Sequence, residues 1–373
     1  MKIAKVEAWV LRAPVAQPVA NAFGSMTNRP ALFVRLSAAD GAWGWGEVFC
    51  NFPQVGPEHR ARLISSIFAP LLEGAEISDA AGLRAFLDLR TRRMAIQCGE
   101  PGPFAQVTGG LEQAMWDMAA RRAGLPLWRL LDDTGAGVGR VQVYASGIGP
   151  QDVVELALTK QAEGYAAFKL KVGFAVDVDR RNLADLRAAL GAQSAIMIDA
   201  NQAWSPGEAV TRIAALADLK PLWIEEPLAA DEDAKYWLQL ARECGLSLAA
   251  GENLRGEAAF TQAVDAGYLR YVQPDVGKWG GLGGCRAVAR HAQAGGAIFC
   301  PHWLAGGIGL AASMHLRAAM GEGGYVEVDA NPNPLREEVC RFKVARGWVE
   351  LPDTPGLGCE PDLVALARFI VKT

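Results

Sequence analysis

Residues 195–227, AIMIDANQAWSPGEAVTRIAALADLKPLWIEEP, decide the fold class because they contain one complete strand–helix–strand unit. Two β-rich runs, Ala195–Asp199 and Leu222–Glu226, enclose a stretch with helical periodicity at 206–217. Each run ends in acidic residues. Strands that alternate with helices over short connections are expected to be parallel, so their carboxyl ends meet at one edge of the sheet.

The same unit recurs along the chain from about residue 141. We predict eight strands, at Val141–Ala145, Ala167–Lys171, Ala195–Asp199, Leu222–Glu226, Ser247–Glu252, Leu269–Asp275, Ala297–Pro301 and Tyr325–Val328. Helical stretches separate them, at 150–163, 177–190, 206–217, 231–244, 256–265, 284–294 and 308–320. Eight parallel strands predict a closed (β/α)-barrel. An open doubly wound sheet is the alternative, which the lack of a glycine-rich phosphate turn disfavours.

The first part of the chain has a different texture and predicts an α+β capping domain. Strands are expected at Lys2–Leu11, Ala31–Ser37 and Trp43–Phe49, with a hairpin turn at Asp40-Gly41, and helices around 58–72, 79–93 and 110–122. We therefore predict a capping domain at 1–125, a barrel at 126–330 and a C-terminal segment at 331–373 that completes the capping domain.

Composition and charge exclude several classes of protein. The chain has a formal net charge of −4 and no block of like charges, which argues against nucleic acid or a membrane surface as a partner. The seven cysteines show no CxxC spacing, so neither disulfides nor a zinc cage are expected. Because no signal segment and no run of about 18 apolar residues occurs, we expect a soluble, cytoplasmic enzyme.

Asp199, Glu225 and Glu252 stand at the ends of three consecutive predicted strands, where barrel enzymes keep their active sites. A single acidic residue after a strand is more often a helix cap or a surface group. Three that face one barrel mouth would repel one another unless a cation lay between them. Oxygen ligands without Cys or His favour a hard ion, so we predict a Mg²⁺ site, with Mn²⁺ as the alternative.

Two further groups have the chemistry of general bases. Lys169 and Lys171 lie two residues apart in an apolar strand, so both side chains point into the barrel mouth. Two close cations and a divalent metal would lower the pKa of a lysine and make it a usable base. His302 follows the seventh predicted strand and Asp275 ends the sixth, so this carboxylate can fix the tautomer of the imidazole and raise its basicity.

The three remaining histidines have a simpler interpretation. His291 and His315 fall inside predicted helices, and His59 lies in a polar stretch. We predict that all three are ordinary surface or packing residues.

A polar group thus ends seven consecutive strands, from Lys171 to Glu327, at intervals of 23 to 28 residues. This set of residues resembles the enolase superfamily, and within it the mandelate racemase branch, over nearly the whole chain. The resemblance implies a (β/α)-barrel covered by a capping domain. It also implies a small carboxylate substrate, whose α-proton is removed to form an enediolate.

The resemblance assigns roles to single residues. It implies as metal ligands Asp199, Glu225 and Glu252, and as bases on opposite faces of the substrate Lys171 and the His302–Asp275 pair. It implies that Lys169 and Glu327 contact the substrate carboxylate and that Asn201 lies near the α-hydroxyl. Asp275 decides the branch, because similar cycloisomerases and dipeptide epimerases have a lysine there, which the nearby Lys278 does not match.

The substrate is less readable than the chemistry. The capping loops at Pro18–Arg29 and Phe49–Pro53 are expected to cover the pocket. The first would contribute to substrate binding through Asn21, Phe23, Ser25 and Met26. These loops have a likeness to acid-sugar dehydratases and sugar-lactone cycloisomerases, although a loop that only closes the site is the alternative.

We predict dehydration of an acid sugar to a 2-keto-3-deoxy acid. Racemisation or epimerisation of an α-hydroxy acid and cycloisomerisation of a sugar lactone are the alternatives, because they use the same two bases. A non-catalytic sensor of carboxylates would not need both Lys171 and the His302–Asp275 pair. We also expect the chain to form a homo-oligomer.

Overall fold

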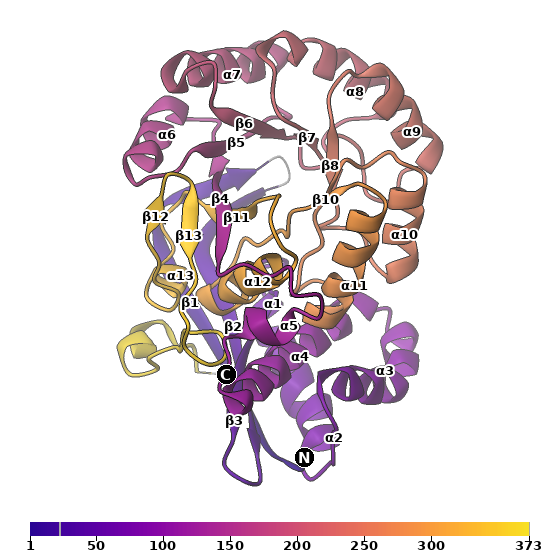
Figure 1. The fold of residues 1–373 in the computed structure, drawn as a ribbon, viewed down its shortest axis with the longest axis vertical. Helices are drawn as coiled ribbons and strands as arrows, with labels where there is room; N and C mark the ends of the chain where they lie inside the picture. The colour runs from indigo at the N-terminus through magenta and orange to yellow at the C-terminus, as the bar shows by residue number, and fades with distance from the viewer. Residues whose placement is uncertain (22–23, 373) are drawn as a thin grey trace.

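The predicted barrel is present in the computed structural model, which describes residues 1–21 and 24–372 (Figure 1). Within these residues the eight parallel barrel strands are β4 (Arg140–Ile148), β5 (Ala167–Lys171), β6 (Ala195–Asp199), β7 (Ile224–Glu225), β8 (Leu248–Ala250), β9 (Tyr271–Val272), β10 (Ile298–Phe299) and β11 (Val326–Asp329). Hydrogen bonds join neighbours from β10 back to β4, and β11 pairs with β4. The strands from β7 to β10 are shorter than predicted, because the chain leaves the ladder where its polar residues begin.

The predicted outer helices are also confirmed and surround the strands (Figure 1). They are α6 (Val153–Ala162), α7 (Val176–Leu190), α8 (Pro206–Ala214), α9 (Ala234–Glu243), α10 (Glu257–Asp265), α11 (Gly281–Ala294) and α12 (Gly307–Ala319), with a short 3₁₀ turn η2 (Ala217–Leu219) after α8. Helix α8 shows why the sequence starts a helix here. Ser205 and Glu208 form a capping box, in which Glu208 Oε2 accepts from Ser205 N at 3.0 Å, and Pro206 occupies the first turn.

One buried layer of side chains fills the interior of the barrel below the mouth. Its members come from successive strands and are Tyr144, Ala167, Met197, Trp223, Ala249, Tyr271 and Cys300. Ala167, Met197, Trp223 and Cys300 each stand two residues before a predicted site residue. Because side chains two apart in a strand share a face, the charged groups stand directly above this packed layer.

The cap contains a three-stranded antiparallel sheet packed on helices. Its elements are β1 (Ile3–Asn21), β2 (Gly24–Ala38), β3 (Trp43–Val48), α1 (Gly56–Leu63), the π-helical turn η1 (Ile64–Phe68), α2 (Ala69–Leu72), α3 (Ala80–Gln97), α4 (Pro101–Ala123) and α5 (Leu127–Leu131). The turn at Asp40-Gly41 is confirmed, with Gly41 at φ +89°. Helix α4 begins nine residues earlier than predicted. It packs against β3 so closely that a Cβ on Gly46 would lie 1.9 Å from Gly110 O.

The predicted segment Pro18–Arg29 consists of paired strands and not of a loop in the residues that the structure describes, but its residues Met26 and Arg29 line the cavity at the barrel mouth, as expected. Strands β1 and β2 extend into this stretch, up to Asn21 and from Gly24, and pair with each other, with Val19 opposite Met26 and Asn21 opposite Gly24. The chain has two prolines here, Pro14 and Pro18, which lack the N–H that a central strand would need. Strand β1 lies at the edge of the sheet, where a residue without an N–H is tolerated, and the register shift falls between Pro14 and Val19.

The C-terminal segment touches both parts of the molecule. Its elements are α13 (Pro334–Glu337), β12 (Val344–Ala345), β13 (Trp348–Glu350) and the 3₁₀ turn η3 (Ala365–Phe369). Strand β13 pairs antiparallel with β4 of the barrel, and Val371 N donates to Val10 O of the cap at 2.9 Å. The boundaries at residues 125 and 330 and the homo-oligomer stay predictions.

Buried carboxylates of the cap hold the beginnings of two barrel helices. Glu47 on β3 accepts from Gly306 N at 2.6 Å and Gly309 N at 2.9 Å, at the start of α12. Glu112 on α4 accepts at 2.7 and 2.9 Å from two N–H groups in the first turn of α11. These helix N–H groups have no partner inside their own helices, so the carboxylates satisfy them. Burial raises the pKa of Glu47 to about 8 and that of Glu112 to about 7.

His315 on α12 is fixed in the same way by backbone groups. Its Nδ1 accepts from Trp128 N and its Nε2 lies at the same distance, 3.1 Å, from Leu357 O. Burial lowers the pKa of His315 to about 4, so the ring is neutral and its two nitrogens are satisfied. The prediction of a packing histidine is confirmed. We call the buried contact region around Glu47, Glu112 and His315 the joint.

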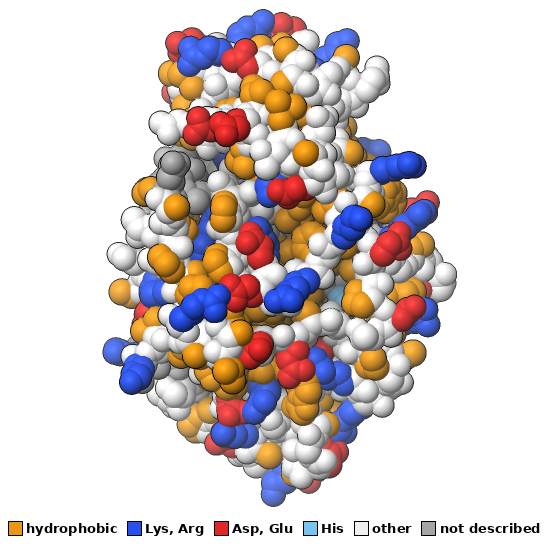
Figure 2. All heavy atoms as spheres, turned by 90° about the vertical axis from the view of Figure 1, so that its left-hand side faces the viewer, with side chains coloured by type: hydrophobic (Ala, Val, Ile, Leu, Met, Phe, Trp, Pro, Cys, Tyr) orange, Lys and Arg blue, Asp and Glu red, His pale blue; other side chains and the backbone are white. Residues whose placement is uncertain are grey.

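Charge on the surface is mixed. Figure 2 shows acidic and basic side chains interspersed over one face of the molecule, without a region of one sign. No helix in the described part of the chain has both the length and the apolar character needed to cross a bilayer.

Candidate active site

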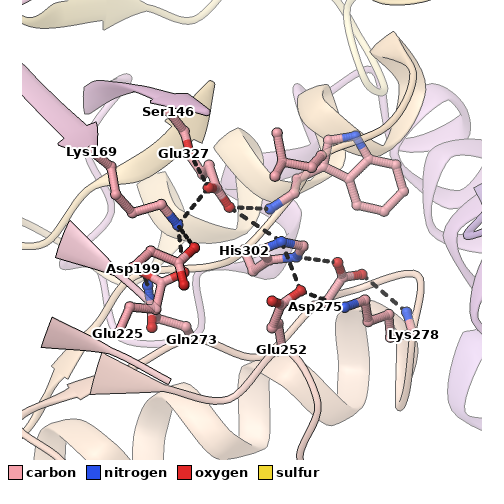
Figure 3. A network of polar contacts seen from close by, with 12 residues as sticks. Ser146, Lys169, Asp199, Glu225, Glu252, Gln273, Asp275, Lys278, His302 and Glu327 are labelled. Carbon is pink, nitrogen blue, oxygen red and sulfur yellow. Dashed lines mark hydrogen bonds and ion pairs between the residues drawn. The ribbon is translucent and has the colours of Figure 1, made fainter. Parts of the chain in front are cut away.

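The barrel mouth gathers the charged residues that the sequence singled out, and Figure 3 shows most of them in one polar network. Their positions are Lys169 and Lys171 on β5, Asp199 and Glu225 at the ends of β6 and β7, Glu252, Asp275 and His302 just after β8, β9 and β10, and Glu327 on β11. All are buried except Glu252, which is partly exposed. The strand-end prediction therefore placed these side chains together correctly.

Lys169 is the centre of the inner half of the network. Its Nζ lies 2.7 Å from Glu327 Oε1 and 3.4 Å from Asp199 Oδ2, and it donates to Glu225 (Figure 3). The side chain has no exposed surface. Burial alone lowers the pKa of Lys169, but Glu225 and Glu327 outweigh it and hold this pKa well above its ordinary value. The lysine is therefore a fixed cation.

Lys171 lies two residues after Lys169 on β5, closer to the barrel mouth, and lines the cavity. Its Nζ donates to Asp199 Oδ2 at 2.5 Å, since the two residues are register partners on neighbouring strands. Although burial and Lys169 lower its pKa, Asp199 and other carboxylates raise it overall. This differs from the expected lowering. The reason is that the Asp199 carboxylate pairs directly with the ammonium group.

The three predicted metal ligands come from adjacent strands. Asp199 and Glu225 are register partners, and burial together with Asp199 raises the pKa of Glu225 to about 7. Side chains from the barrel also hold Glu225, since Gln273 Nε2 donates to it at 2.6 Å. Glu252 instead contacts Lys278 and His302.

This donor set fits a hard cation in chemistry. Within residues 1–21 and 24–372 no three Asp, Glu, His or Cys groups converge as a ready-made cation site, because lysine and histidine already pair with these carboxylates. Asp199, Glu225 and Glu252 are nevertheless buried or half-buried oxygen donors that repel one another. A divalent cation with a preference for oxygen would offset that repulsion.

His302 and Asp275 form the predicted pair. His302 Nδ1 lies 2.6 Å from Asp275 Oδ2, and Asp275 Oδ1 accepts from Gly277 N at 2.7 Å, which fixes the carboxylate. His302 Nε2 faces Glu252 at 3.0 Å and Glu327 at 3.4 Å. Burial lowers the pKa of the imidazole, but these carboxylates raise it to about 10. His302 is therefore protonated in this structure and can donate a proton into the cavity.

Several polar residues at the site were not predicted. Lys278, to which the sequence assigned no role, is only 8% exposed and contacts Glu252. Its Nζ lies 4.8 Å from the centre of the Phe49 ring. Ser146 Oγ donates to Glu327 Oε1 at 2.5 Å. The position of Lys278, three residues after Asp275, was the available signal, because one turn carries both residues into the mouth.

Two predicted or nearby amides have free acceptors. Asn201 lines the cavity with its backbone at φ +45°, and its Oδ1 is buried without a partner among the described residues. Asn51 donates to Leu304 O, while its Oδ1 is likewise buried and unpartnered there. Both carbonyl oxygens can accept a hydrogen bond from a ligand hydroxyl.

The remaining substrate-binding predictions are settled only in part. Met26 lines the cavity. Phe23 lies outside the described residues, and the side chains of Asn21 and Ser25 are also outside what the structure describes. The Phe49–Pro53 segment follows β3 without regular structure, and three of its residues line the cavity.

The cavity joins the barrel mouth to the cap and has a volume of about 430 Å³. Lys171 and His302 border it from the barrel, and Arg29, Asn51 and Arg60 from the cap. A cavity of this size suits a small-molecule substrate.

Sequence families match both parts of the chain. The family described as Mandelate racemase / muconate lactonizing enzyme, N-terminal domain, matches residues 5–132. The family described as Enolase C-terminal domain-like matches residues 152–365.

Curated relatives span the chain almost completely. A D-galactarolactone cycloisomerase of Agrobacterium fabrum is 29% identical over 99% of this chain and 99% of that protein. A D-galactonate dehydratase of Ralstonia nicotianae is 30% identical over 89% of this chain and 88% of that protein.

Solved structures also match this chain over almost its whole length. A mandelate racemase/muconate lactonizing enzyme of Bordetella bronchiseptica RB50 has 47% identity and a TM-score of 0.92, with 99% of each chain covered. A racemase of Streptomyces coelicolor with bound magnesium has 29% identity and a TM-score of 0.88, with 99% of this chain and 100% of that chain covered.

Proposed function

Because the chain belongs to the enolase superfamily, in its mandelate racemase branch, we propose that it dehydrates an acid sugar to a 2-keto-3-deoxy acid. Membership confirms the family resemblance and makes the chain an enzyme of the lyase or isomerase kind. The observation that carries the proposal is that one cavity has two proton-handling groups on its border, Lys171 and His302.

The proposed reaction needs one base and one acid. Lys171 must first lose the proton that its pairing with Asp199 stabilises in this structure, and a cation held by Asp199 would weaken that pairing. The neutral lysine then takes the proton from the α-carbon, and the C–H electrons form an enediolate with the carboxylate. His302 gives its Nε2 proton to the β-hydroxyl, the β C–O bond breaks, and water leaves. The resulting enol takes a proton at the β-carbon and becomes the 2-keto acid. The positively charged His302 of this structure suits the acid role.

We propose Asp199, Glu225 and Glu252 as ligands of Mg²⁺, with Mn²⁺ as the alternative. The ion would supply positive charge to the substrate carboxylate and make the α-proton more acidic. Lys169 and Glu327 have no exposed surface. We therefore propose that Lys169 holds Glu225 and Asp199 in place, and that Glu327 holds Lys169. Their direct contact with the substrate carboxylate stays a prediction.

The acid-sugar class follows from the unpartnered acceptors of Asn51 and Asn201. A buried polar atom without a partner costs about 1–3 kcal/mol. A polyhydroxy acid can donate to both oxygens, whereas a purely apolar acid would leave them unpaired. Asn201 is the proposed partner of the α-hydroxyl.

Lactone cycloisomerisation is the second candidate. The D-galactarolactone cycloisomerase of Agrobacterium fabrum matches 99% of this chain. That reaction class also needs a proton removed and a proton returned, so the same two groups can serve it.

A substrate screen with purified enzyme and Mg²⁺ tests the proposal. Mono- and diacid sugars, their lactones and simple α-hydroxy acids are incubated in D₂O, and 2-keto products and α-deuterium are measured. We expect a 2-keto product from an acid sugar. Deuterium at the α-carbon without keto product would favour a racemase, and turnover confined to lactones would favour the cycloisomerase.

A further inference from the structure

The end of the cavity against the cap has two arginines that form no ion pair among the described residues, and the nearby carboxylate, Glu100, pairs with His59 at 3.1 Å. Arg60 on α1 is 5% exposed, and its guanidinium donates only to neutral acceptors, Gln106 Oε1 at 3.0 Å and Phe52 O at 3.3 Å. Arg255, in the loop before α10, is exposed and borders the same cavity. Neither arginine forms an ion pair within the part of the chain that the structure describes.

Every other cation of the cavity is paired. Arg29 lies 2.8 Å from Asp329, Lys171 lies 2.5 Å from Asp199, and Lys278 contacts Glu252. The unpaired charge is therefore confined to one end of the cavity.

The beginning of helix α4 lies at the same place. Gly102 borders the cavity, and a Cβ added to it would lie 2.9 Å from Arg255 Nη1, so that guanidinium rests on the first turn of α4. A 23-residue helix adds partial positive charge at its N-terminus. Burial lowers the pKa of Arg60, and the charge of Arg255 lowers it further, although Cys50 and Glu100 raise it in part. The two arginines therefore lie close enough to repel each other. We call the region around Arg60, Arg255 and Gly102 the distal end.

We propose that the distal end binds a second carboxylate of the substrate, so that the enzyme acts on sugar diacids in preference to monoacids. The inference rests on the proposed function and narrows its substrate class. A guanidinium presents a planar fork of N–H donors, which matches a carboxylate in two parallel hydrogen bonds. Arg60 is held in place by Gln106 and the Phe52 carbonyl, so little freedom is lost when it binds.

The experiment compares a sugar monoacid, the diacid of the same stereochemistry and the phosphorylated monoacid. We measure kcat/KM with Mg²⁺ for the wild type, Arg255→Met and Arg60→Met. Arg180→Met is the matched control, because Arg180 is also exposed but lies on α7 and pairs with Asp218 at 2.7 Å. Calorimetry of the same three acids with each Mg²⁺-loaded protein measures binding independently of turnover.

We expect the wild type to prefer the diacid by at least tenfold, and Arg255→Met to lower its kcat/KM about ten- to hundredfold while the monoacid value stays unchanged. A change confined to the diacid is not expected from general structural damage. Since Arg60 is buried, Arg60→Met is interpreted only if its thermal unfolding matches the wild type. Arg255→Met, at an exposed position, keeps the test decisive otherwise.

Three results would overturn the inference. The first is that the wild type binds and turns over the monoacid and the diacid equally well. The second is that Arg255→Met lowers kcat/KM equally for both acids. The third is that the wild type prefers the phosphorylated monoacid to the diacid. If α-deuterium exchange occurs on the monoacid in D₂O without any diacid preference, the proposed function stands and this inference fails. If no acid sugar exchanges but calorimetry shows diacid preference lost in Arg255→Met, the inference stands and the reaction is wrong.

Discussion

The barrel mouth and the joint both contain buried ionisable side chains, and these side chains differ in what they contact. At the barrel mouth, Lys169, Glu225 and His302 bind other charged side chains. At the joint, Glu47 and His315 bind backbone N–H and C=O groups. Backbone partners cannot change their protonation, whereas side-chain partners can be exchanged for a substrate or an ion. Burial alone therefore does not separate the predicted catalytic residues from Glu47 and His315, whereas the kind of partner does.

The largest effect is expected at the mouth for Glu225→Gln. A neutral amide cannot offset the charge of a divalent ion, so Mg²⁺ binding should weaken and turnover should be abolished with the fold intact. Turnover is measured during a Mg²⁺ titration, with circular dichroism as the check on folding. The control is Glu243→Gln, an exposed acid on α9. Full activity of the wild type after treatment with EDTA would contradict the metal assignment.

A smaller loss, of about 10²–10⁴-fold in turnover, is expected for Asp275→Asn. The substitution removes the charge that stabilises the protonated His302 at 2.6 Å. Asp265→Asn is a closely matched control, since Asp265 lies 2.7 Å from His291 in an exposed pair. If His302→Asn keeps the wild-type rate on every substrate, His302 is a structural residue. The barrel mouth would then not differ from the joint in the role of its buried histidine.

At the joint, His315→Gln should leave turnover unchanged and alter stability only in acid. The folded pKa of His315 is about 4, below the ordinary 6.5, so its stabilising contribution is present above pH 6.5 and is lost as the pH falls toward 4. At pH 5 the wild type should lose about 2 kcal/mol through this group. Glutamine can keep both backbone contacts without titrating. Parallel unfolding midpoints of both proteins from pH 7 to 5 would contradict this reading.

The smallest effect at pH 5 is expected for Glu47→Gln, a loss of about 1 kcal/mol with turnover retained, because one backbone N–H at the start of α12 loses its acceptor. The pKa of Glu47 is raised to about 8, so the wild-type contribution is largest below pH 4.5 and decreases as the pH rises through 8. The variant should therefore be slightly less stable than the wild type in acid and more stable than it by pH 8, because the wild type loses about 4 kcal/mol through this group over that range. Thermal unfolding at pH 5 and 8 measures the stability difference, and a large loss of kcat would place Glu47 in the catalytic machinery.

The two regions also differ in how far the sequence predicts them. The mouth was predictable because a strand is a local pattern, and a polar residue at its end must lie at the barrel rim. Glu47 could not be assigned, since its partner Gly309 stands 262 residues away. Lys278 was missed for a related reason, because its contact with Glu252 depends on how two loops meet.

The hairpin of β1 and β2 shows the opposite error. Pro14 and Pro18 are local signals that normally end a strand, yet the edge position of β1 permits them. Such a position is a property of the assembled sheet and cannot be read from either residue. The roles given to Lys171, Asp199 and Asn201 stay predictions until the variants are measured.

The cap and the barrel are encoded in separate parts of the gene, which has a consequence for recombination between related genes. The cap residues around the cavity, Met26, Asn51, Arg60 and Gln106, are all encoded before residue 110, and both proposed proton-handling groups are encoded after residue 170. A single crossover between two related genes, within the codons for 124–140, would give one descendant the selectivity of one parent and the chemistry of the other. Arg255 is the exception, since it would travel with the barrel. Glu47 and Glu112 set the condition for such hybrids, because their helix partners are inherited from the other parent.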